Sequence, residues 1–350
     1  MKKLLISLFL MRMFLAGCSA SNGEEKQVLK VFNWGEYIDT EVIAEFEDLY
    51  NARVIYDTYD TNELMYTKIQ GGEAYDILNP TDHMVERLIS EGLVQKIDLS
   101  KIPNMSNIYP ELLNRPFDPN NEYSVPYFWG NIGIIYNTTT VDVADLEAEG
   151  WKVLANPKYT DRIYIYDSSR DAFMIAEKAL GYSVNTTNEA EIEAAYQFLK
   201  TINDTTKPIY IDETIIDSMI TEQKDLAVDF SGDAAFIISQ NPNMSFYVPA
   251  EGTNVWMDSM VIPTNAPNPD LAYKWINFMM ENDVATRNTI YVGYTSPNIA
   301  AFESVTGAGG DYEGNPAYGP RMNNPLDEVY RYDDALKSIL ADKWTRVKAE

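Results

Sequence analysis

The chain has 350 residues, of which 45% are hydrophobic, and its formal net charge is −26. This length exceeds what one compact core usually organises, so we expect two domains. The acidic balance argues against nucleic-acid binding and favours cationic partners. With one Cys and one His, the chain has no pair for a disulfide, and a structural zinc site or a Cys/His nucleophilic pair is not expected.

The N-terminus has the pattern of a secretory signal peptide. Two lysines precede the apolar segment Leu4 to Phe14, which is too short to span a bilayer. The Leu15-Ala16-Gly17-Cys18 sequence that follows resembles the lipobox of bacterial lipoproteins. This resemblance implies that residues 1–17 are removed and that Cys18 is lipidated, with 18–27 as a tether; the alternative is an N-terminal helix with an unmodified thiol. We therefore expect an extracytoplasmic protein, lipid-anchored to the membrane on its periplasmic face or outer surface.

The first part of the body alternates strands and helices. The hydrophobic pattern predicts strands at 28–34, 52–59 and 75–78, and helices at 40–50, 62–70 and 84–91. This order implies a parallel sheet with helices on both faces. Ligands bind beyond the C-terminal ends of the strands in such sheets, where residues 33–37 and 79–83 lie.

The remaining elements are organised around an apolar segment at 125–136, which we expect to cross between the domains. Further strands are predicted at 162–167, 226–230 and 245–249, helices at 171–180, 189–202, 269–280 and 326–347, and loops at 114–126, 151–158 and 316–325. Ser168 or Ser169 is placed to cap the helix at 171–180. Ser231-Gly232-Asp233 forms a turn into another helix.

The segment Trp256-Met257-Asp258-Ser259 precedes an apolar run. In an extended segment, residues two apart point to the same side, so Trp256 and Asp258 face one space while Met257 and Ser259 face away. A ring and a carboxylate directed into one cleft suit an organic ammonium ion. These four residues alone are equally compatible with a half-buried strand that carries a core Trp and a solvated Asp.

A series of short motifs runs along the chain. They are Asn33 to Ile38, Tyr75-Asp76, Pro116 to Asn121, Ser124 to Tyr127, Trp129-Gly130, Leu180 to Ser183, Glu191 to Tyr196, Trp256 to Ser259 and Gly293 to Asn298. In this order they resemble the spermidine/putrescine-binding proteins of ABC transporters. The resemblance implies an α/β, two-lobed periplasmic-binding-protein-like fold of type II with a hinge of crossover strands. One lobe would comprise 28–130 and 257–302, the other 131–256 and 303–350.

The resemblance also implies a set of ligand-binding residues between the lobes. Matched position by position, they are Trp34, Glu36, Tyr37, Thr81, His83, Asp171, Phe230, Asp233, Trp256, Asp258 and Tyr294. Four of them differ from the family's usual residue: Thr81 replaces a Ser, His83 a Tyr, Asp171 a Glu and Phe230 a Trp.

Selectivity is expected to depend on acidic residues in the second lobe. Asp233 follows an aromatic residue by three positions, as in the putrescine-type proteins. Ser168 stands where the spermidine-type proteins carry an Asp, although Asp167 lies beside it. A C-terminal contact of the family falls near Tyr332. The resemblance thus leaves spermidine, putrescine or both as ligands.

Physical chemistry supports the same assignment. Each buried charge of a polyamine requires a carboxylate, and its methylene groups require apolar walls. The candidate acids are Glu36, Asp171, Asp233 and Asp258, and the candidate walls are Trp34, Tyr37, Phe230, Trp256 and Tyr294. Ordinary structural roles exist for each: an N-cap for Asp233, a first-turn acid for Asp171, a core position for the tryptophans, and an exposed loop position for Glu36 and His83.

The sequence therefore predicts the extracytoplasmic substrate-binding component of an ABC importer, a monomer that needs no cofactor or metal and meets permease subunits at the membrane. One alternative is a protein of the same fold for another solute, such as a sugar, or an amino acid with Arg170 as carboxylate receptor. A glycoside hydrolase is another, since paired carboxylates beside rings suit that chemistry, but no G-x-S-x-G, H-E-x-x-H or Walker A motif accompanies them. A structural surface lipoprotein or adhesin is the third.

Overall fold

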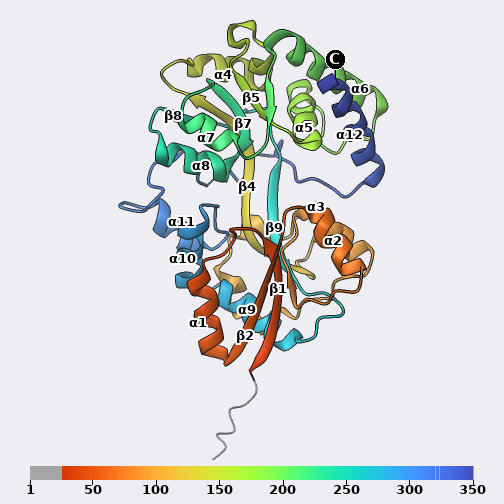
Figure 1. Ribbon diagram of the computed structural model, residues 1–350, viewed down its shortest axis with the longest axis vertical. Helices are drawn as coiled ribbons and strands as arrows, with labels where there is room; N and C mark the ends of the chain where they lie inside the picture. The colour runs from red at the N-terminus through yellow and green to blue at the C-terminus, as the bar shows by residue number, and fades with distance from the viewer. Residues whose placement is uncertain (1–25, 320, 323, 350) are drawn as a thin grey trace, which may run out of the picture.

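The computed structural model describes residues 26–319, 321–322 and 324–349. The predicted signal peptide, Cys18 and nearly all of the 18–27 tether lie outside the described residues. Two lobes stand one above the other and are joined by the long strands β4 (Ser124–Asn137) and β9 (Val255–Val261), as Figure 1 shows. No helix in the described part of the chain combines the length and the apolar character that crossing a membrane requires.

The first lobe is built on three parallel strands. These are β1 (Gln27–Trp34), β2 (Ala52–Tyr59) and β3 (Ile77–Leu78), with β1 in the middle. The helices of this lobe are α1 (Thr40–Tyr50), α2 (Asn62–Gln70), α3 (Asp82–Ser90), α9 (Pro269–Met279) and α10 (Asn282–Val292). Three short 3-10 helices lie at 99–101, 103–107 and 110–112. One hydrophobic cluster that includes Phe32, Phe46, Trp129 and Trp275 holds the lobe together.

The second lobe contains β5 (Ile163–Tyr166), β6 (Ile209–Ile211), β7 (Leu226–Phe230) and β8 (Met244–Tyr247). Its helices are α4 (Val143–Glu149), α5 (Ser169–Leu180), α6 (Glu189–Thr206), α7 (Ile215–Ile220), α8 (Ser231–Gln240) and α12 (Asp334–Ala349), with 3-10 helices at 150–155 and 157–159. One cluster packs around Trp151 and Phe173, and another joins α7 and α8 to Val305 of α11 (Ile299–Thr306).

The strand β4 runs through both cores. β4 pairs antiparallel with β9 along Ser124 to Asn131, and then with β7 from Ile132 and with β8 from Ile134. Trp129 packs into the first cluster, whereas Ile132 packs into the second. The strand order is β2-β1-β3-β9-β4-β7-β5-β6, with β8 beside β4. The predicted α/β two-lobed fold with crossover strands is thus confirmed, and the apolar segment 125–136 is its crossover.

The predicted helix at 326–347 is wrong at its start, because α12 begins at Asp334. Residues 325–326 form a turn, and Glu328 forms an isolated parallel bridge with Asn254. Glu328 donates its backbone N–H to the carbonyl of Thr253 and accepts from the N–H of Val255. These bonds to a distant segment satisfy the backbone in place of a helical turn. Residues 151–158, predicted as loop, form two 3-10 helices, and α4, α7, α10 and α11 were not predicted.

Candidate functional site

The loops after β1 and β3 meet β9 at one carboxylate. The hydroxyl of Tyr37 donates to Oδ2 of Asp258 over 2.7 Å. Thr81 forms an isolated bridge with Asp258 in the backbone, and its hydroxyl is hydrogen-bonded to the same carboxylate. Thr81 accepts a hydrogen bond from Nδ2 of Asn62 at 3.1 Å, which leaves its own proton for Asp258. The three side chains therefore fix the position of the Asp258 carboxylate.

Aromatic rings surround this carboxylate. The ring of Tyr294 lies 5.6 Å from that of Tyr37 and 5.4 Å from that of Trp256, edge to face in both cases. Phe230 lies 6.3 Å from Trp256, also edge to face. Trp256 and Asp258 thus both border the Tyr37/Tyr294 pair, as the alternation of an extended segment predicts.

The site continues across the lobes. The hydroxyl of Tyr294, packed against the first cluster, donates to Oδ1 of Asp233 in the first turn of α8 at 3.0 Å. Phe230 occupies the N-cap position of α8, so Asp233 is not its N-cap. Gly232 permits the contact, because a Cβ there would lie 2.1 Å from the Tyr294 ring.

Two further buried acids lie in the second lobe. Asp171 is in the first turn of α5, which Ser168 caps as predicted, and it accepts a hydrogen bond from the hydroxyl of Tyr330 at 2.7 Å. Asp229, near the end of β7, accepts from the N–H of Phe230 at 2.9 Å, and its other oxygen has no hydrogen-bond partner among the described residues. Both acids line a small cavity of about 10 Å³.

Burial makes the ionised forms of these acids costly. It raises the pKa of Asp258 to about 7, although hydrogen bonds from Tyr37 and Thr81 oppose the shift. It likewise raises the pKa of Asp233 to about 6, against the hydrogen bond from Tyr294. An approaching cation would remove this cost by pairing with the ionised carboxylate.

The other two acids behave in the same way. Burial, with the charge of Asp233 as a second cause, raises the pKa of Asp229 well above its ordinary value, and burial raises that of Asp171. Within the described residues, no ion pair links Asp171, Asp229, Asp233 or Asp258 to a lysine or arginine. A group of largely buried acids without direct ion pairs is a functional-site signal.

Three predicted site residues, Trp34, Glu36 and His83, form no hydrogen bond or ring contact with Asp258, Asp233 or Tyr294 among the described residues. Trp34 is half-buried and donates its indole N–H to the carbonyl of Asn79 at 2.9 Å. Glu36 is exposed, with a left-handed backbone at φ 51°.

His83 is half-buried in the first turn of α3, and its Nδ1 lies 3.4 Å from Oδ1 of Asp82. A positive charge on His83 would lower the pKa of Asp171. His83 in the first lobe therefore lies within electrostatic range of an acid in the second.

Asp229 and Tyr330 are parts of the site that sequence reasoning missed. For Asp229 a signal existed, because an acid directly before Phe230 sits near the C-terminal end of a predicted strand. Tyr332, the expected C-terminal position, instead bonds Asp334 through its hydroxyl. Asp167, which lies beside Ser168, accepts from Lys348 and from the indole N–H of Trp344 at 2.8 Å and so belongs to the α12 interface.

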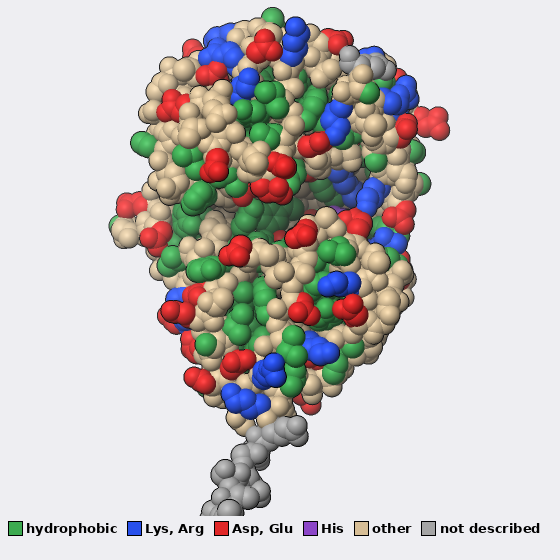
Figure 2. All heavy atoms as spheres, in the orientation of Figure 1, with side chains coloured by type: hydrophobic (Ala, Val, Ile, Leu, Met, Phe, Trp, Pro, Cys, Tyr) green, Lys and Arg blue, Asp and Glu red, His purple; other side chains and the backbone are tan. Residues whose placement is uncertain are grey.

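Figure 2 shows this face of the molecule hollowed between the two lobes, with hydrophobic side chains inside the hollow and acidic ones along its edges. The contacts described above join side chains of both lobes across this region. The arrangement combines buried carboxylates with aromatic walls, which suits an organic cation.

Comparisons with known proteins agree with the fold. Residues 41–317 match the family model described as bacterial extracellular solute-binding protein. The chain is 38% identical over 287 residues to the spermidine/putrescine-binding periplasmic protein of Salmonella typhimurium, covering 81% of this chain and 82% of that protein.

Solved structures give the same result. The spermidine/putrescine ABC transporter substrate-binding protein PotD of Streptococcus pneumoniae superposes with a TM-score of 0.82 and 37% identity, over 93% of this chain and 99% of that one. The Tp0655 (TpPotD) lipoprotein of Treponema pallidum gives a TM-score of 0.78 and 28% identity, over 93% and 100%. The chain belongs to the family of bacterial extracellular solute-binding proteins.

Proposed function

We propose that this protein is the extracytoplasmic substrate-binding component of an ABC importer and that it captures polyamines between its lobes. The observation that carries the proposal is the set of three buried carboxylates, Asp171, Asp229 and Asp258, with the half-buried Asp233. They form no ion pair with a lysine or arginine among the described residues and border aromatic rings. The names of the relatives from Salmonella typhimurium and Streptococcus pneumoniae support the same ligand class.

The two ends of a diamine would bind in different lobes. Asp258, on β9 beside the first-lobe residue Tyr37, would pair with one ammonium group, and the second-lobe acids around Asp233 with the other. The rings of Trp256 and Tyr294 would cover the methylene groups. Each charge-assisted hydrogen bond contributes about 1.5–3 kcal/mol, and each cation–π contact about 0.5–2 kcal/mol. Such a sum is sufficient for micromolar affinity, which corresponds to about −8 kcal/mol.

The remaining predicted site residues would complete the cleft. Trp34 and Glu36 would lie at its first-lobe edge, with Thr81 holding Asp258 in place and His83 facing Asp171. Ser168 caps α5 and supplies no carboxylate, and the neighbouring Asp167 is bound by Lys348. We therefore propose that putrescine binds at least as tightly as spermidine.

Membrane attachment and partners follow from the same function. We propose that Cys18 is lipidated, that the protein acts as a monomer, and that it delivers its ligand to permease subunits. The relative from Treponema pallidum is itself described as a lipoprotein. The division into 28–130 with 257–302, and 131–256 with 303–350, is proposed for the two lobes that move during delivery.

An amino-acid ligand is less well supported. Arg170, the expected receptor for its carboxylate, donates to the carbonyl of Arg331 at 2.6 Å and lies 4.4 Å over the ring of Tyr330. A sugar would leave the buried acids without counter-charges. The similar proteins named above are substrate-binding proteins, and we propose that this chain likewise performs no catalysis.

Calorimetric titration of the mature protein tests the proposal. Putrescine and spermidine should bind with dissociation constants in the micromolar range or below, and glutamate, arginine and maltose should give no heat. Binding of an amino acid or sugar without binding of either polyamine would refute the proposal.

A further inference from the structure

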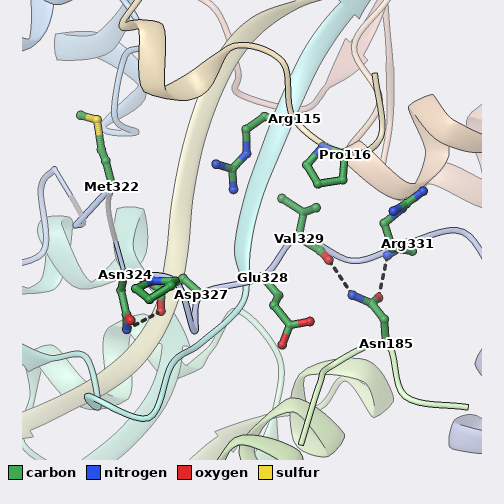
Figure 3. Close-up of a pocket in the computed structure, with 10 residues that line it drawn as sticks. Arg115, Pro116, Asn185, Met322, Asn324, Asp327, Glu328, Val329 and Arg331 are labelled. Carbon is green, nitrogen blue, oxygen red and sulfur yellow. Dashed lines mark hydrogen bonds between the residues drawn. The ribbon is translucent and has the colours of Figure 1, made fainter. Parts of the chain in front are cut away.

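A second cavity, of about 480 Å³, lies beside the crossover strands and shares no residue with the candidate polyamine site. Figure 3 shows it with β4 and β9 alongside. It is lined by Arg115, Pro116, Asn185, Met322, Asn324, Pro325, Asp327, Glu328, Val329 and Arg331. Arg115 lies between Leu112 and Phe117 of the first cluster, whereas Asn185 follows Val184 of the second. Both lobes therefore contribute to its walls.

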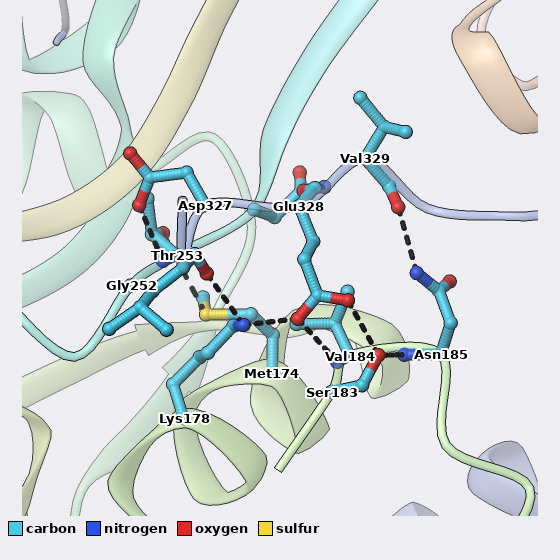
Figure 4. A network of polar contacts seen from close by, with 12 residues as sticks. Met174, Lys178, Ser183, Val184, Asn185, Gly252, Thr253, Asp327, Glu328 and Val329 are labelled. Atoms are coloured by element: carbon cyan, nitrogen blue, oxygen red, sulfur yellow. Dashed lines mark hydrogen bonds and ion pairs between the residues drawn. The ribbon is translucent and has the colours of Figure 1, made fainter. Parts of the chain in front are cut away.

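The two acids in this cavity already have counter-charges. Figure 4 shows Glu328 bonded to Lys178, with further bonds from the hydroxyl of Ser183 at 2.5 Å and the N–H of Val184 at 3.4 Å. Asp327 accepts two bonds of 2.9 Å from the guanidinium of Arg321. Neither acid is therefore free to hold a cation.

One of the two arginines is also neutralised. Arg331 pairs with Glu86 of α3, with its Nε at 2.9 Å and 3.0 Å from the two carboxylate oxygens. Arg115 differs, because its side chain forms no hydrogen bond and no ion pair with any described residue, and its Nε is buried. Figure 3 shows its guanidinium directed into the cavity. Asp82 and Asp327 lie within electrostatic range of this guanidinium but do not bond it. Among the described lining residues, Arg115 is therefore the cation without a direct ion pair.

We propose that this cavity is a second ligand site and that it binds a small organic carboxylate through Arg115. A guanidinium presents a planar pair of donors that matches the two oxygens of a carboxylate. The cavity volume falls within the ~300–1,000 Å³ of small-molecule sites. Pro116, Met322, Pro325 and Val329 supply apolar walls for the carbon chain.

The walls favour an organic acid over an inorganic oxyanion. Phosphate has no apolar part to place against Pro116 or Val329. Its second negative charge would also find no second lysine or arginine without an ion pair among the described lining residues. A monocarboxylate with a short alkyl chain matches both the one guanidinium without an ion pair and the apolar lining.

Saturation-transfer NMR of the mature full-length protein with pentanoate at pH 7.5 tests this proposal. Pentanoate should bind the wild type, and Arg115→Met should weaken binding at least tenfold. Arg53→Met, an exposed arginine on β2, makes the same change in net charge far from the cavity and should bind like the wild type. Arg115→Lys keeps the charge without the planar fork and should bind with intermediate affinity.

Two results would overturn the proposal. One is the absence of saturation transfer to pentanoate at 10 mM or below, which corresponds to less than about 3 kcal/mol of binding free energy. The other is binding that Arg115→Met leaves unchanged while the thermal melt shows the variant to be folded. Phosphate should not displace pentanoate at equal concentration; displacement would show that the apolar walls contribute nothing and would refute the assignment to an organic acid.

Discussion

Tyr37 and Asp258 are 221 positions apart in the sequence, yet the tyrosine hydroxyl lies 2.7 Å from the aspartate carboxylate. The tyrosine follows the end of β1, and the aspartate lies within the crossover strand β9. Their contact places a buried acid at the junction of the lobes. A cation bound at this acid would therefore contact a strand that joins the two lobes.

Asp258→Asn should weaken ligand binding and stabilise the ligand-free protein against unfolding. The loss of the carboxylate should weaken putrescine binding at least tenfold, because an ammonium would lose its counter-charge. The pKa of Asp258 is about 7 against an ordinary 3.8, so the folded protein holds its proton more tightly than the unfolded chain. At pH 8 the ionised group therefore costs stability, by about 1.4 kcal/mol for each pKa unit.

The variant should consequently raise the free energy of unfolding of the ligand-free protein by about 2–4 kcal/mol at pH 8. The gain should shrink as the pH falls below about 7 and vanish near pH 4. Thermal melts across this range measure it, with Asp342→Asn on the exposed face of α12 as the control. A destabilised Asp258→Asn protein at pH 8 would contradict this account of the carboxylate.

Polyamine binding should weaken as the solution becomes more acidic. A bound cation requires ionised carboxylates, whereas the pKa values of about 7 for Asp258 and about 6 for Asp233 mean that both acids take up protons between pH 8 and pH 5. The dissociation constant for putrescine should rise at least tenfold over this range. Calorimetry at pH 6.5 in buffers of different ionisation enthalpy should detect proton release on binding. Proton uptake would be the opposite of what the burial of these acids predicts.

Gly232→Ala should disturb the bridge between the lobes. The added Cβ would lie 2.1 Å from the ring of Tyr294, so the ring must shift and its hydrogen bond to Asp233 must break. We expect putrescine affinity to fall about tenfold or more, since a wall and an oriented carboxylate are both affected. Tyr294→Phe removes only the hydroxyl and should have a smaller effect. Equal affinities for Gly232→Ala and the wild type would show that the ring position does not matter.

Ion pairs beside the cleft should set how long the lobes stay together. Glu86 of the first lobe accepts from Arg331 and from the backbone N–H of Tyr332, just before α12 of the second. Exposed pairs contribute about 0–1 kcal/mol, so Glu86→Gln should raise the dissociation rate of putrescine about twofold to fivefold. Stopped-flow fluorescence measures this rate. Glu193→Gln breaks a pair with Lys343 within the second lobe and should leave the rate unchanged; equal effects of the two variants would argue against this role for Glu86.

Local sequence patterns predicted the parts of the fold that local forces determine. Alternating apolar residues identified β1 and β2, and the largely apolar segment at 125–136 identified the crossover strand β4. The spacing of Trp256 and Asp258 predicted their common side, because strand geometry alone fixes it. The cap at Ser168 follows from the same local chemistry.

Long-range contacts explain what the sequence did not reveal. The apolar residues between 326 and 333 resemble a helical stripe, but Val329 packs in the first hydrophobic cluster and Tyr330 in the second. A local hydrophobic pattern cannot show that two neighbouring residues pack into different cores. Asp229 of β7 and Tyr330 of the segment before α12 come near Asp171 of α5 only through the tertiary fold.

The most direct test of the central claim compares putrescine with butylamine, which has the same carbon chain and one ammonium group. If acids of both lobes each pair with one end of the ligand, putrescine should bind at least about a hundredfold more tightly than butylamine. Butylamine leaves one carboxylate without an ammonium partner, and the loss of that charge-assisted hydrogen bond costs about 3 kcal/mol. Calorimetric dissociation constants for both amines at pH 8 and physiological salt give the ratio. Equal affinities would show that only one carboxylate group engages the ligand and would contradict the account.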